Sequence, residues 1–532
     1  MSWFSVSRGQ GTDSRWRVQE SNSLRTALSW WLPGRISWKV GSSLEHEQRS
    51  GPGAIQLSGS TSDAVLGRPT RAPHLADQLE REIVDAGWPV GSLVGTEAEL
   101  LERFDVGRGV LREAARLLED RQIARMRRGR GGGLIVLEPD VQAVTDATAI
   151  YLESLGVTPN DIFEARQVLD LFAVGLAADR IDEKNSTRLR ELLQQEQEAD
   201  ELQIMGGSHR QIHAAIAEAS GNPVIAVFAE ALSLLSDDQD ELRGRLTGAA
   251  SRRAVAGVHW AHQSIIEAII SGDGLLASHR MLKHLNALRQ DFVHRSERAE
   301  IRTNDPASSG QTGRVLSRRI RHDIAKMNWP IDHNLGSETE LLERYGTGRG
   351  TLREAVRLLE YHTAVQMRRG PGGGLIVRAP DGESVMHAVA LHLAYRGIKA
   401  VDLFEAREAL EMAALQLAIE RLTEEGTDRL TRALGGNDLS SVGFAQSAHD
   451  FHVVIAELSG NQTLQLFVAI LTRITAKRLE EPGAQRGATP GNVREQVDYA
   501  HRKIVDAILD GDVPLARRRM RIHLRSLECS IA

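Results

Sequence analysis

Apolar positions recur with the period of a helix along most of the chain. Residues 73–86 place Leu75, Leu79 and Ile83 on one face, and Gly87 ends the pattern. Apolar side chains at this spacing pack together on one side of an α-helix, and glycine is favoured just beyond a helix end. The first predicted element is therefore a short amphipathic helix.

A helix-turn-helix and a β-hairpin are predicted next. Thr96 precedes Glu99 by three residues, a capping-box pattern that opens the helix TEAELLERF, and Gly107 separates it from a second helix, RGVLREAARLLEDRQ. The segments ARMRR and LIVLE then predict two short strands joined by the glycine-rich turn RGRGGG. Together with the first helix, these elements predict a winged helix-turn-helix domain over residues 71–140.

Behind this domain the apolar period is helical only, which predicts an all-helical bundle over residues 141–297. The polar, turn-rich segment 298–312 follows as a linker. The second half repeats the order, with a winged helix-turn-helix over 313–381 and a helical bundle over 382–532. The predicted fold class is mainly α, with two winged helix-turn-helix domains that are each followed by an all-α bundle.

The repeat is visible residue by residue. Residues 95–140 align with residues 336–381 without a gap, at an offset of 241, and 30 of the 46 positions are identical. This period is far longer than that of a solenoid, so we interpret it as duplication of a whole domain set. Residues 1–70 stand outside the repeat. They hold five of the eight tryptophans without sustained periodicity, and we predict a disordered N-terminal extension or a segment upstream of the true start.

Composition adds a local charge pattern to this picture. The formal net charge is -6, but nine arginines face four acids between Arg103 and Arg130, and six face two between Arg344 and Pro371. The duplicated stretches are therefore basic, as expected for an anionic partner. The single cysteine, Cys529, excludes an internal disulfide and a thiolate metal cluster, and the chain has no long apolar run. We expect a cytoplasmic, nucleoid-associated protein without a membrane span.

Arginines at the start of the second helix of each helix-turn-helix are suited to reading DNA, because their forked guanidinium matches the acceptors of guanine in the major groove. We predict Arg108 and Arg349 as base readers, beside Gly109 and Gly350. Arg112 and Arg353, one turn further on, would contact bases or phosphates. The alternative for this second pair is an ion pair with a glutamate of the same head.

The hairpin tips carry further candidates for contact with the DNA backbone or the minor groove. They are Arg127, Arg128 and Gly129 in the first copy and Arg368, Arg369 and Gly370 in the second. The alternative is a hairpin that is only solvated. No Lys-Ser/Thr pair follows the glycines, so a tight turn is favoured over a nucleotide site.

Both bundles carry three histidines at identical spacing, with gaps of 49 and 22 residues. The histidines are His213, His262 and His284 in the first bundle and His452, His501 and His523 in the second. Imidazoles that converge from different helices can bind a divalent metal, and zinc, nickel and iron all suit this ligand type. The alternative is that each histidine is an ordinary, partly buried residue.

These patterns resemble a known family. The order of helix, TEAELLERF, GRGVLREAARLLE, basic strand and GGG-LIV is similar to the winged-helix head of GntR-type bacterial transcription regulators. The bundle resembles the FCD effector domain of the FadR subfamily, through His213-AAIAEAS-Gly221-Asn222-Pro223 and its copy from Phe451 to Gln462. One departure is that Ala98 and Thr339 stand where the family often has arginine.

The resemblance implies a fourth metal ligand and an effector. The family often has an aspartate four residues before the first histidine; His209 stands there in the first unit and Ala448 in the second, which predicts weaker or different metal binding in the second. Arg166 and Arg407 match an arginine that contacts a small carboxylate effector. The alternative for both is a salt bridge within the bundle, for example with the neighbouring Glu164 or Glu405.

The sequence predicts a transcription regulator whose operator binding is modulated by a small organic acid or a similar effector. A repressor is favoured over an activator. A metal-dependent hydrolase and a non-specific, nucleoid-type DNA-binding protein are the alternatives. Because one chain carries two heads, we predict an intramolecular pseudo-dimer on a pseudo-palindromic DNA operator; further homodimerisation stays open. Differences such as Val106 against Thr347, Val110 against Thr351 and Arg130 against Pro371 predict an asymmetric operator.

Overall fold

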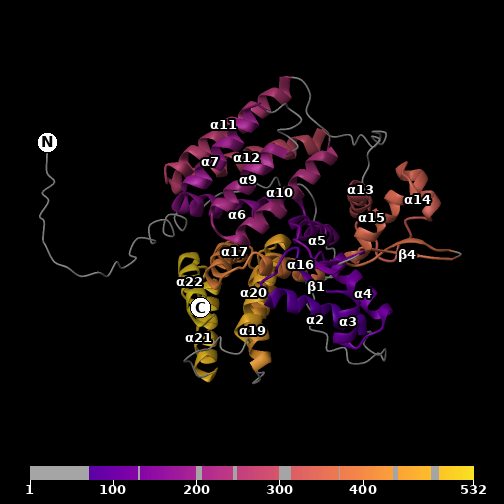
Figure 1. Cartoon of the computed structure of the whole chain (residues 1–532). Coiled ribbons are helices and arrows are strands. Elements are labelled where there is room, and N and C mark those ends of the chain that lie inside the picture. The colour runs from indigo at the N-terminus through magenta and orange to yellow at the C-terminus, as the bar shows by residue number, and fades with distance from the viewer. Residues whose placement is uncertain are drawn as a thin grey trace, which may run out of the picture.

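The computed structural model describes residues 71–129, 132–198, 207–243, 249–298, 313–370, 372–380, 382–434, 441–480 and 490–531. The predicted N-terminal extension and most of the predicted linker lie outside these residues. The described residues form two winged heads and two helical bundles (Figure 1). The predicted mainly α fold is confirmed.

The two heads have the same plan. Head 1 consists of α2 (Arg71–Asp85), β1 (Leu93–Gly95), α3 (Glu97–Phe104), α4 (Arg108–Asp120), β2 (Ala124–Arg127) and β3 (Gly133–Val136). Head 2 consists of α13 (Gly313–Lys326), α14 (Glu338–Tyr345), α15 (Arg349–Tyr361), β4 (Val365–Arg368) and β5 (Gly374–Val377). The capping box is present: the Glu99 carboxylate accepts from the Thr96 backbone N–H, and the Thr96 hydroxyl accepts from that of Glu99.

The sequence did not predict the short strand β1, which completes an antiparallel sheet of order β1-β3-β2. A glycine is required where β3 meets β1, because a Cβ at Gly133 would lie 2.3 Å from the carbonyl oxygen of Gly95. In head 2 a single bridge between Asn334 and Ile376 takes the place of this pairing. Beneath each sheet, the apolar face of the second helix of the helix-turn-helix fills the core, with Leu111 and Leu118 fully buried in head 1.

Each head is followed by a bundle. Bundle 1 consists of α5 (Val141–Ser154), α6 (Pro159–Arg180), α7 (Glu183–Glu198), α9 (His209–Ala219), α10 (Pro223–Arg243), α11 (Ala249–Ile270) and α12 (Gly274–Arg298). Bundle 2 consists of α16 (Gly382–Tyr395), α17 (Ala400–Glu420), α18 (Glu424–Ala433), α19 (Ser441–Leu458), α20 (Gln462–Glu480), α21 (Pro490–Leu509) and α22 (Val513–Ile531). Among the described residues, no helix combines the length and the apolar character that crossing a membrane requires.

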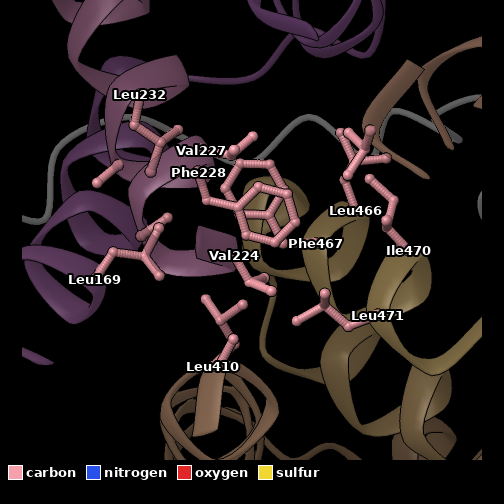
Figure 2. Packing of buried hydrophobic residues seen from close by; sticks show 14 of the residues in the cluster. Leu169, Val224, Val227, Phe228, Leu232, Leu410, Leu466, Phe467, Ile470 and Leu471 are labelled. Atoms are coloured by element: carbon pink, nitrogen blue, oxygen red, sulfur yellow. The ribbon is translucent and has the colours of Figure 1, made fainter. Parts of the chain in front are cut away.

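The two bundles pack on each other within the one chain. A single buried cluster joins residues of α5, α6 and α10 to residues of α16, α17 and α20. At its centre the rings of Phe228 and Phe467 are stacked, with centroids 4.1 Å apart and an interplanar angle of 3° (Figure 2). Side chains such as Leu169 and Leu410 surround this pair, so the interface between the bundles is a continuous hydrophobic core.

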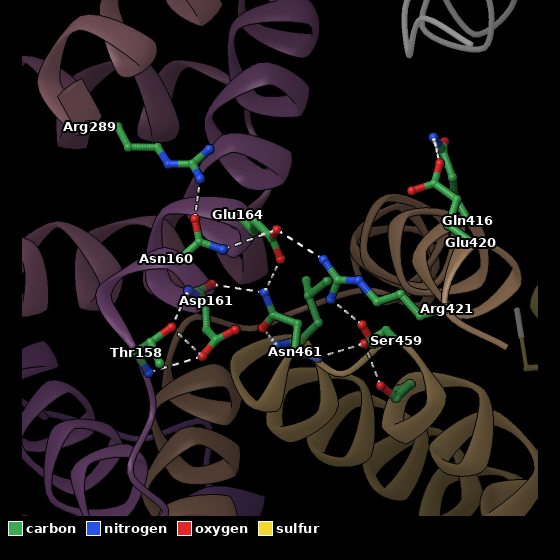
Figure 3. Close-up of polar contacts among 12 residues, drawn as sticks. Thr158, Asn160, Asp161, Glu164, Arg289, Gln416, Glu420, Arg421, Ser459 and Asn461 are labelled. Atoms are coloured by element: carbon green, nitrogen blue, oxygen red, sulfur yellow. Dashed lines mark hydrogen bonds and ion pairs between the residues drawn. The ribbon is translucent and has the colours of Figure 1, made fainter. Parts of the chain in front are cut away.

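A reciprocal polar contact flanks this core on both sides. The Asn461 side-chain amide donates to the Asp161 carbonyl oxygen and to the Glu164 carboxylate, and Arg421 also contacts Glu164 (Figure 3). On the other side, the Asn222 amide donates to the Asp402 carbonyl and the Glu405 carboxylate. The Gly-Asn step of each bundle is thus part of its contact with the other bundle. The partner bundle thus supplies the hydrogen-bond acceptors for amide groups that pairing buries.

The heads are attached crosswise. Leu391 and Tyr395 of α16, in bundle 2, belong to the apolar core of head 1. Ile150 of α5, in bundle 1, belongs to the core of head 2. Positions 150 and 391 are equivalent at the offset of 241. Each head therefore docks on the first helix of the other unit's bundle.

Candidate functional site

The predicted DNA-reading arginines lie at the exposed start of α4 and α15. Arg108 is the first residue of α4 and Arg349 the first of α15, and both are exposed. Arg112 and Arg353 follow one turn later and are exposed as well. Arg108 forms a long ion pair with Glu97, at 3.9 Å, and the Arg108 side chain remains 76% exposed. The sequence alternative of an ion pair holds only in this weak form, for Arg353 with Glu338 at 3.8 Å.

The backbone at these helix starts is also accessible. The N-cap residues Gly107 and Gly348 have no side-chain cap, so the first backbone N–H groups of both helices keep their donor capacity. A Cβ placed at Gly109 or Gly350 would meet no atom within 4 Å, so neither glycine packs against the protein. A helix N-terminus with a bare backbone and adjacent arginines is suited to a phosphate or a base edge.

The wings place further arginines on the surface. Arg127 and Arg128 in head 1 and Arg368 and Arg369 in head 2 are exposed where β2 and β4 end. Gly129 and Gly370 follow with φ of 102° and 98°, a left-handed conformation that favours glycine. Arg130 and Pro371, the predicted difference between the wing tips, lie outside the described residues.

Four histidines converge in bundle 1. His209 and His213 come from α9, His262 from α11 and His284 from α12, and their candidate donor atoms lie within 4.8 Å of one another. Nε2 of His213 lies 3.3 Å from Nε2 of His284. Two nitrogens bound to one tetrahedral zinc ion at about 2.0–2.1 Å would be about 3.3–3.4 Å apart. The cluster therefore has the spacing of a metal site.

Two buried carboxylates lie beside these imidazoles, and the one at His262 is hydrogen-bonded to the ring. Oε1 of Glu196 lies 2.8 Å from Nδ1 of His262, whose buried Nε2 has no hydrogen-bond partner among the described residues. Oδ2 of Asp170 lies 3.3 Å from Nδ1 of His213. A carboxylate at Nδ1 fixes the tautomer that leaves Nε2 free to bind a metal. Sequence reasoning missed both acids, although the equivalent position of Asp170 in unit 2 carries another acid, Glu411.

Burial favours the neutral form of three of the four imidazoles, His209, His213 and His284. Burial lowers the pKa of His213 to about 4, although Asp170 acts in the opposite direction. Burial, with the neighbouring imidazoles, holds the pKa of His209 and of His284 well below the usual range. Neutral imidazole is the form that binds a metal ion. These imidazoles therefore remain unprotonated near neutral pH, and their lone pairs are available to a metal ion.

Bundle 2 has a cluster of three histidines. Nε2 of His523 lies 3.1 Å from Nε2 of His501 and 3.3 Å from Nε2 of His452. Oε2 of Glu411 lies 2.6 Å from Nδ1 of His452. Burial opposes ionisation of Glu411, but Arg407 and His452 lower its pKa to about 2. The three-histidine frame and its carboxylate are therefore repeated.

The surroundings of this second cluster differ. His449 does not join it: Nδ1 of His449 lies 2.8 Å from the Thr472 hydroxyl. The ring of Phe451 stacks on His501, with centroids 3.8 Å apart, where bundle 1 has Ile212. The second cluster thus offers three imidazoles and an aromatic wall.

The two predicted effector-binding arginines are buried beside the clusters. Arg166 is 2% exposed and its Nε lies 3.2 Å from Oδ2 of Asp170. Arg407 is 2% exposed and its Nε lies 2.6 Å from Oε1 of Glu411. Both form a salt bridge within the bundle, but the partner is the acid four residues on.

The partners named in the sequence alternative were wrong. Glu164 and Glu405, which stand two residues before the arginines, contact Arg421 and Arg180 across the interface between the bundles. Nη2 of Arg166 is buried without a hydrogen-bond partner among the described residues. A buried guanidinium with spare donor capacity beside a histidine cluster could accept an anion.

Comparisons with known proteins agree with this organisation. The pattern described as "Bacterial regulatory proteins, gntR family" matches residues 71–133 and 312–374, and the FCD domain matches residues 161–287 and 402–526. The chain is 28% identical over 231 residues to the HTH-type transcriptional repressor NanR of Cronobacter sakazakii, covering 42% of this chain and 86% of the relative. It is 27% identical over 237 residues to NanR of Citrobacter rodentium, covering 43% and 88%. A solved structure, Streptococcus agalactiae GntR, matches 41% of this chain and 99% of its own, at 23% identity and a TM-score of 0.29.

Proposed function

Because the chain belongs to the gntR family of bacterial regulatory proteins, with an FCD domain behind each of two heads, we propose that it represses transcription from one operator in response to a small effector. It is a DNA-binding transcription regulator and not an enzyme. The direction of regulation follows the relatives, which are described as repressors. Membership of the FadR subfamily stays a prediction, as does action at the nucleoid.

The observation that supports DNA reading most strongly is the pair of uncapped helix starts with exposed arginines. Head 1 presents Arg108 and Arg112 there, and head 2 presents Arg349 and Arg353. The two heads sit on one paired body, so they can engage two half-sites of a pseudo-palindrome. Position 110 in α4 is valine and the equivalent position 351 in α15 is threonine, which favours half-sites of different sequence.

The test uses DNA that the unaltered chain selects from a random duplex pool. Arg108→Ala and Arg349→Ala should each weaken binding to the selected duplex by about 1–3 kcal/mol and relax specificity in one half-site only. Binding to a scrambled duplex should change little. Arg81→Ala, an exposed arginine on α2, is the matched control. Equal losses on both duplexes would reduce the arginines to phosphate contacts, and failure to select any sequence would favour a non-specific DNA-binding protein.

For the bundles we propose a divalent metal, zinc or nickel, that helps to bind a carboxylate effector. His209, His213, His262 and His284 would hold it in bundle 1, and His452, His501 and His523 in bundle 2. The described donor spacing and the neutral imidazoles support this set. A divalent ion when bound supplies a positive centre for an anion. The chain's own contribution is to orient the imidazoles and to place Arg166 and Arg407 beside them.

The effector proposal rests on Nη2 of Arg166, a buried donor with no partner in the described structure. Zinc-loaded chain would be titrated with a panel of short mono- and dicarboxylic acids, and binding followed by calorimetry. Arg166→Lys keeps the charge but removes the fork, so it should weaken binding of the best acid about tenfold or more. Unchanged affinity in both Arg166→Lys and Arg407→Lys would place the anion elsewhere.

A further inference from the structure

The two surfaces on which the heads dock are unlike in charge. Seam 1 is the contact between head 1 and α16, and seam 2 is the contact between head 2 and α5. Both form around equivalent apolar residues, Leu391 in seam 1 and Ile150 in seam 2. The apolar part alone would let either head sit on either helix, because apolar contact is not directional.

In seam 1 the head is acidic. The Glu80 carboxylate, whose side chain is 13% exposed, lies 3.2 Å from Nε2 of His387 on α16. Asp77 lies one turn away on α2, and Arg121 of the same head contacts both acids, at 2.8 Å and 2.7 Å. The Tyr395 hydroxyl of α16 also donates to Glu138 at the exit of head 1. The receiving helix α16 therefore faces carboxylates.

In seam 2 the head is basic. Nε of Arg321, whose side chain is 4% exposed, lies 2.7 Å from the Glu153 carboxylate of α5. Arg314 lies 3.5 Å from Asp140 at the start of α5. Burial raises the pKa of Asp146 on α5, and Arg321, Arg314 and Arg318 act against that shift. The receiving helix α5 therefore faces arginines.

These charges are reversed at equivalent positions. At the offset of 241, Asp77 and Glu80 of head 1 correspond to Arg318 and Arg321 of head 2. On the receiving helices, Asp146 and Glu153 of α5 correspond to His387 and Ala394 of α16. Within a repeat whose reading elements are nearly unchanged, the docking surface of the head thus carries acids in unit 1 and arginines in unit 2, and the receiving helix carries two acids in α5 but a histidine and an alanine in α16.

We propose that this reversal is a pairing code that directs head 1 onto α16 and head 2 onto α5. In the uncrossed arrangement, the acids Asp77 and Glu80 would face the acids Asp146 and Glu153. The arginines of α13 would lose their acidic partners on α5 and would face His387 and Ala394 instead. Charges of like sign held together in a partly desolvated contact are strongly unfavourable. The code selects against the uncrossed arrangement and leaves the crossed one.

The consequence is that each head contacts a helix that leads to the sensor of the other unit. Helix α16 leads directly to α17, which carries Arg407, and α5 leads to α6, which carries Arg166. Head 1 therefore rests on the helix attached to the histidine cluster of unit 2, and head 2 on the helix attached to that of unit 1. The pairing itself does not depend on any effector or DNA, so its test is separate from that of the proposed function.

The test converts the docking surface of head 1 into that of head 2. Asp77→Arg, Glu80→Arg and Arg121→His introduce the residues that head 2 carries at positions 318, 321 and 362, so each replacement already fits this fold. Hydrogen exchange of the full chain, followed by mass spectrometry, reports on α16. We expect exchange in α16 to become about tenfold faster, which corresponds to about 1.4 kcal/mol, with exchange in α5 unchanged.

A compensating change on α16 distinguishes an effect of charge from general damage to head 1. Adding His387→Asp and Ala394→Glu gives α16 the acids of α5 and should return its exchange to the original rate. Asp85→Arg, an exposed site on α2, is the control for added positive charge and should leave α16 unaffected. The pairing code is refuted if the triple change does not alter exchange in α16. It is equally refuted if the compensated chain exchanges as fast as the triple variant, including through unfolding of head 1.

Discussion

The two histidine clusters share a frame and differ in what surrounds it. In bundle 1 the frame gains His209, and Glu196 orients His262 from a fully buried position. In bundle 2 position 448 is alanine, and Phe451 is stacked on His501. A further ligand raises metal affinity, whereas an aromatic wall adds neither charge nor a donor. The two copies therefore share their three central histidines and differ in the residues around them.

The largest expected effect is the loss of zinc affinity when a central histidine is removed from one cluster. His213→Ala should lower zinc affinity in bundle 1 by more than about 100-fold, since loss of an orienting partner alone costs about 10- to 100-fold. His452→Ala should remove only the weaker site of bundle 2. Zinc retained per chain against a competing chelator measures both.

An exposed histidine serves as the control for this comparison. His333→Ala, in the loop before α14, should leave zinc binding unchanged. If either central substitution removed all bound zinc, the two sites would be coupled and the comparison would have to be abandoned.

The second prediction extends the comparison to the heads and to pH. Burial, with the nearby Arg321, lowers the pKa of His362 in head 2 to about 4, and head 1 has Arg121 at this position. The unfolded chain binds the proton first, near pH 6.5. Head 2 should therefore be fully stable above that pH and lose stability as pH falls from about 6.5 to 4, by at most about 3 kcal/mol.

Hydrogen exchange in α15 and α4, corrected for the intrinsic pH dependence, measures this difference between the heads. His362→Gln should flatten the response of α15 because it removes the titrating group. A loss of protection that is equal in both heads would assign the effect to the shared core instead.

The smallest effect sharpens the comparison by exchanging one position. Ala448→His gives unit 2 the residue that stands at position 209 in unit 1, and should raise zinc affinity there about tenfold; His209→Ala should lower that of unit 1 by a similar factor. Isothermal titration with zinc measures both. Should Ala448→His have no effect, the missing fourth ligand would not limit zinc binding in bundle 2.

Much of the fold could be predicted because its signals are local. Capping, helical period and glycine turns lie within a few residues, and the gap-free repeat extended each of them to the second unit. The strand β1 was missed because three residues, LVG, carry no period of their own and become a strand only by pairing with β3. Local patterns cannot show pairing of this kind.

The sequence did not reveal site residues whose role depends on contacts with residues far away in the chain. The histidines were found because both copies repeat their spacing. Glu196 orients His262 from 66 residues away in the chain, and no motif connects the two. The role of Asn222 was missed for the same reason, since its partner Glu405 belongs to the other unit. The crosswise docking of the heads likewise depends on residues that only the folded chain brings together.

The shared core around Phe228 and Phe467 has a consequence for gene dosage. In a regulator assembled from two separate chains, the amount of paired protein falls more steeply than the total concentration on dilution. Here both halves of the paired body are made together, and joining them is an intramolecular event with a high effective concentration. A cell with few copies of this chain would therefore still hold complete two-headed regulators, and operator occupancy would follow copy number in simple proportion at low occupancy.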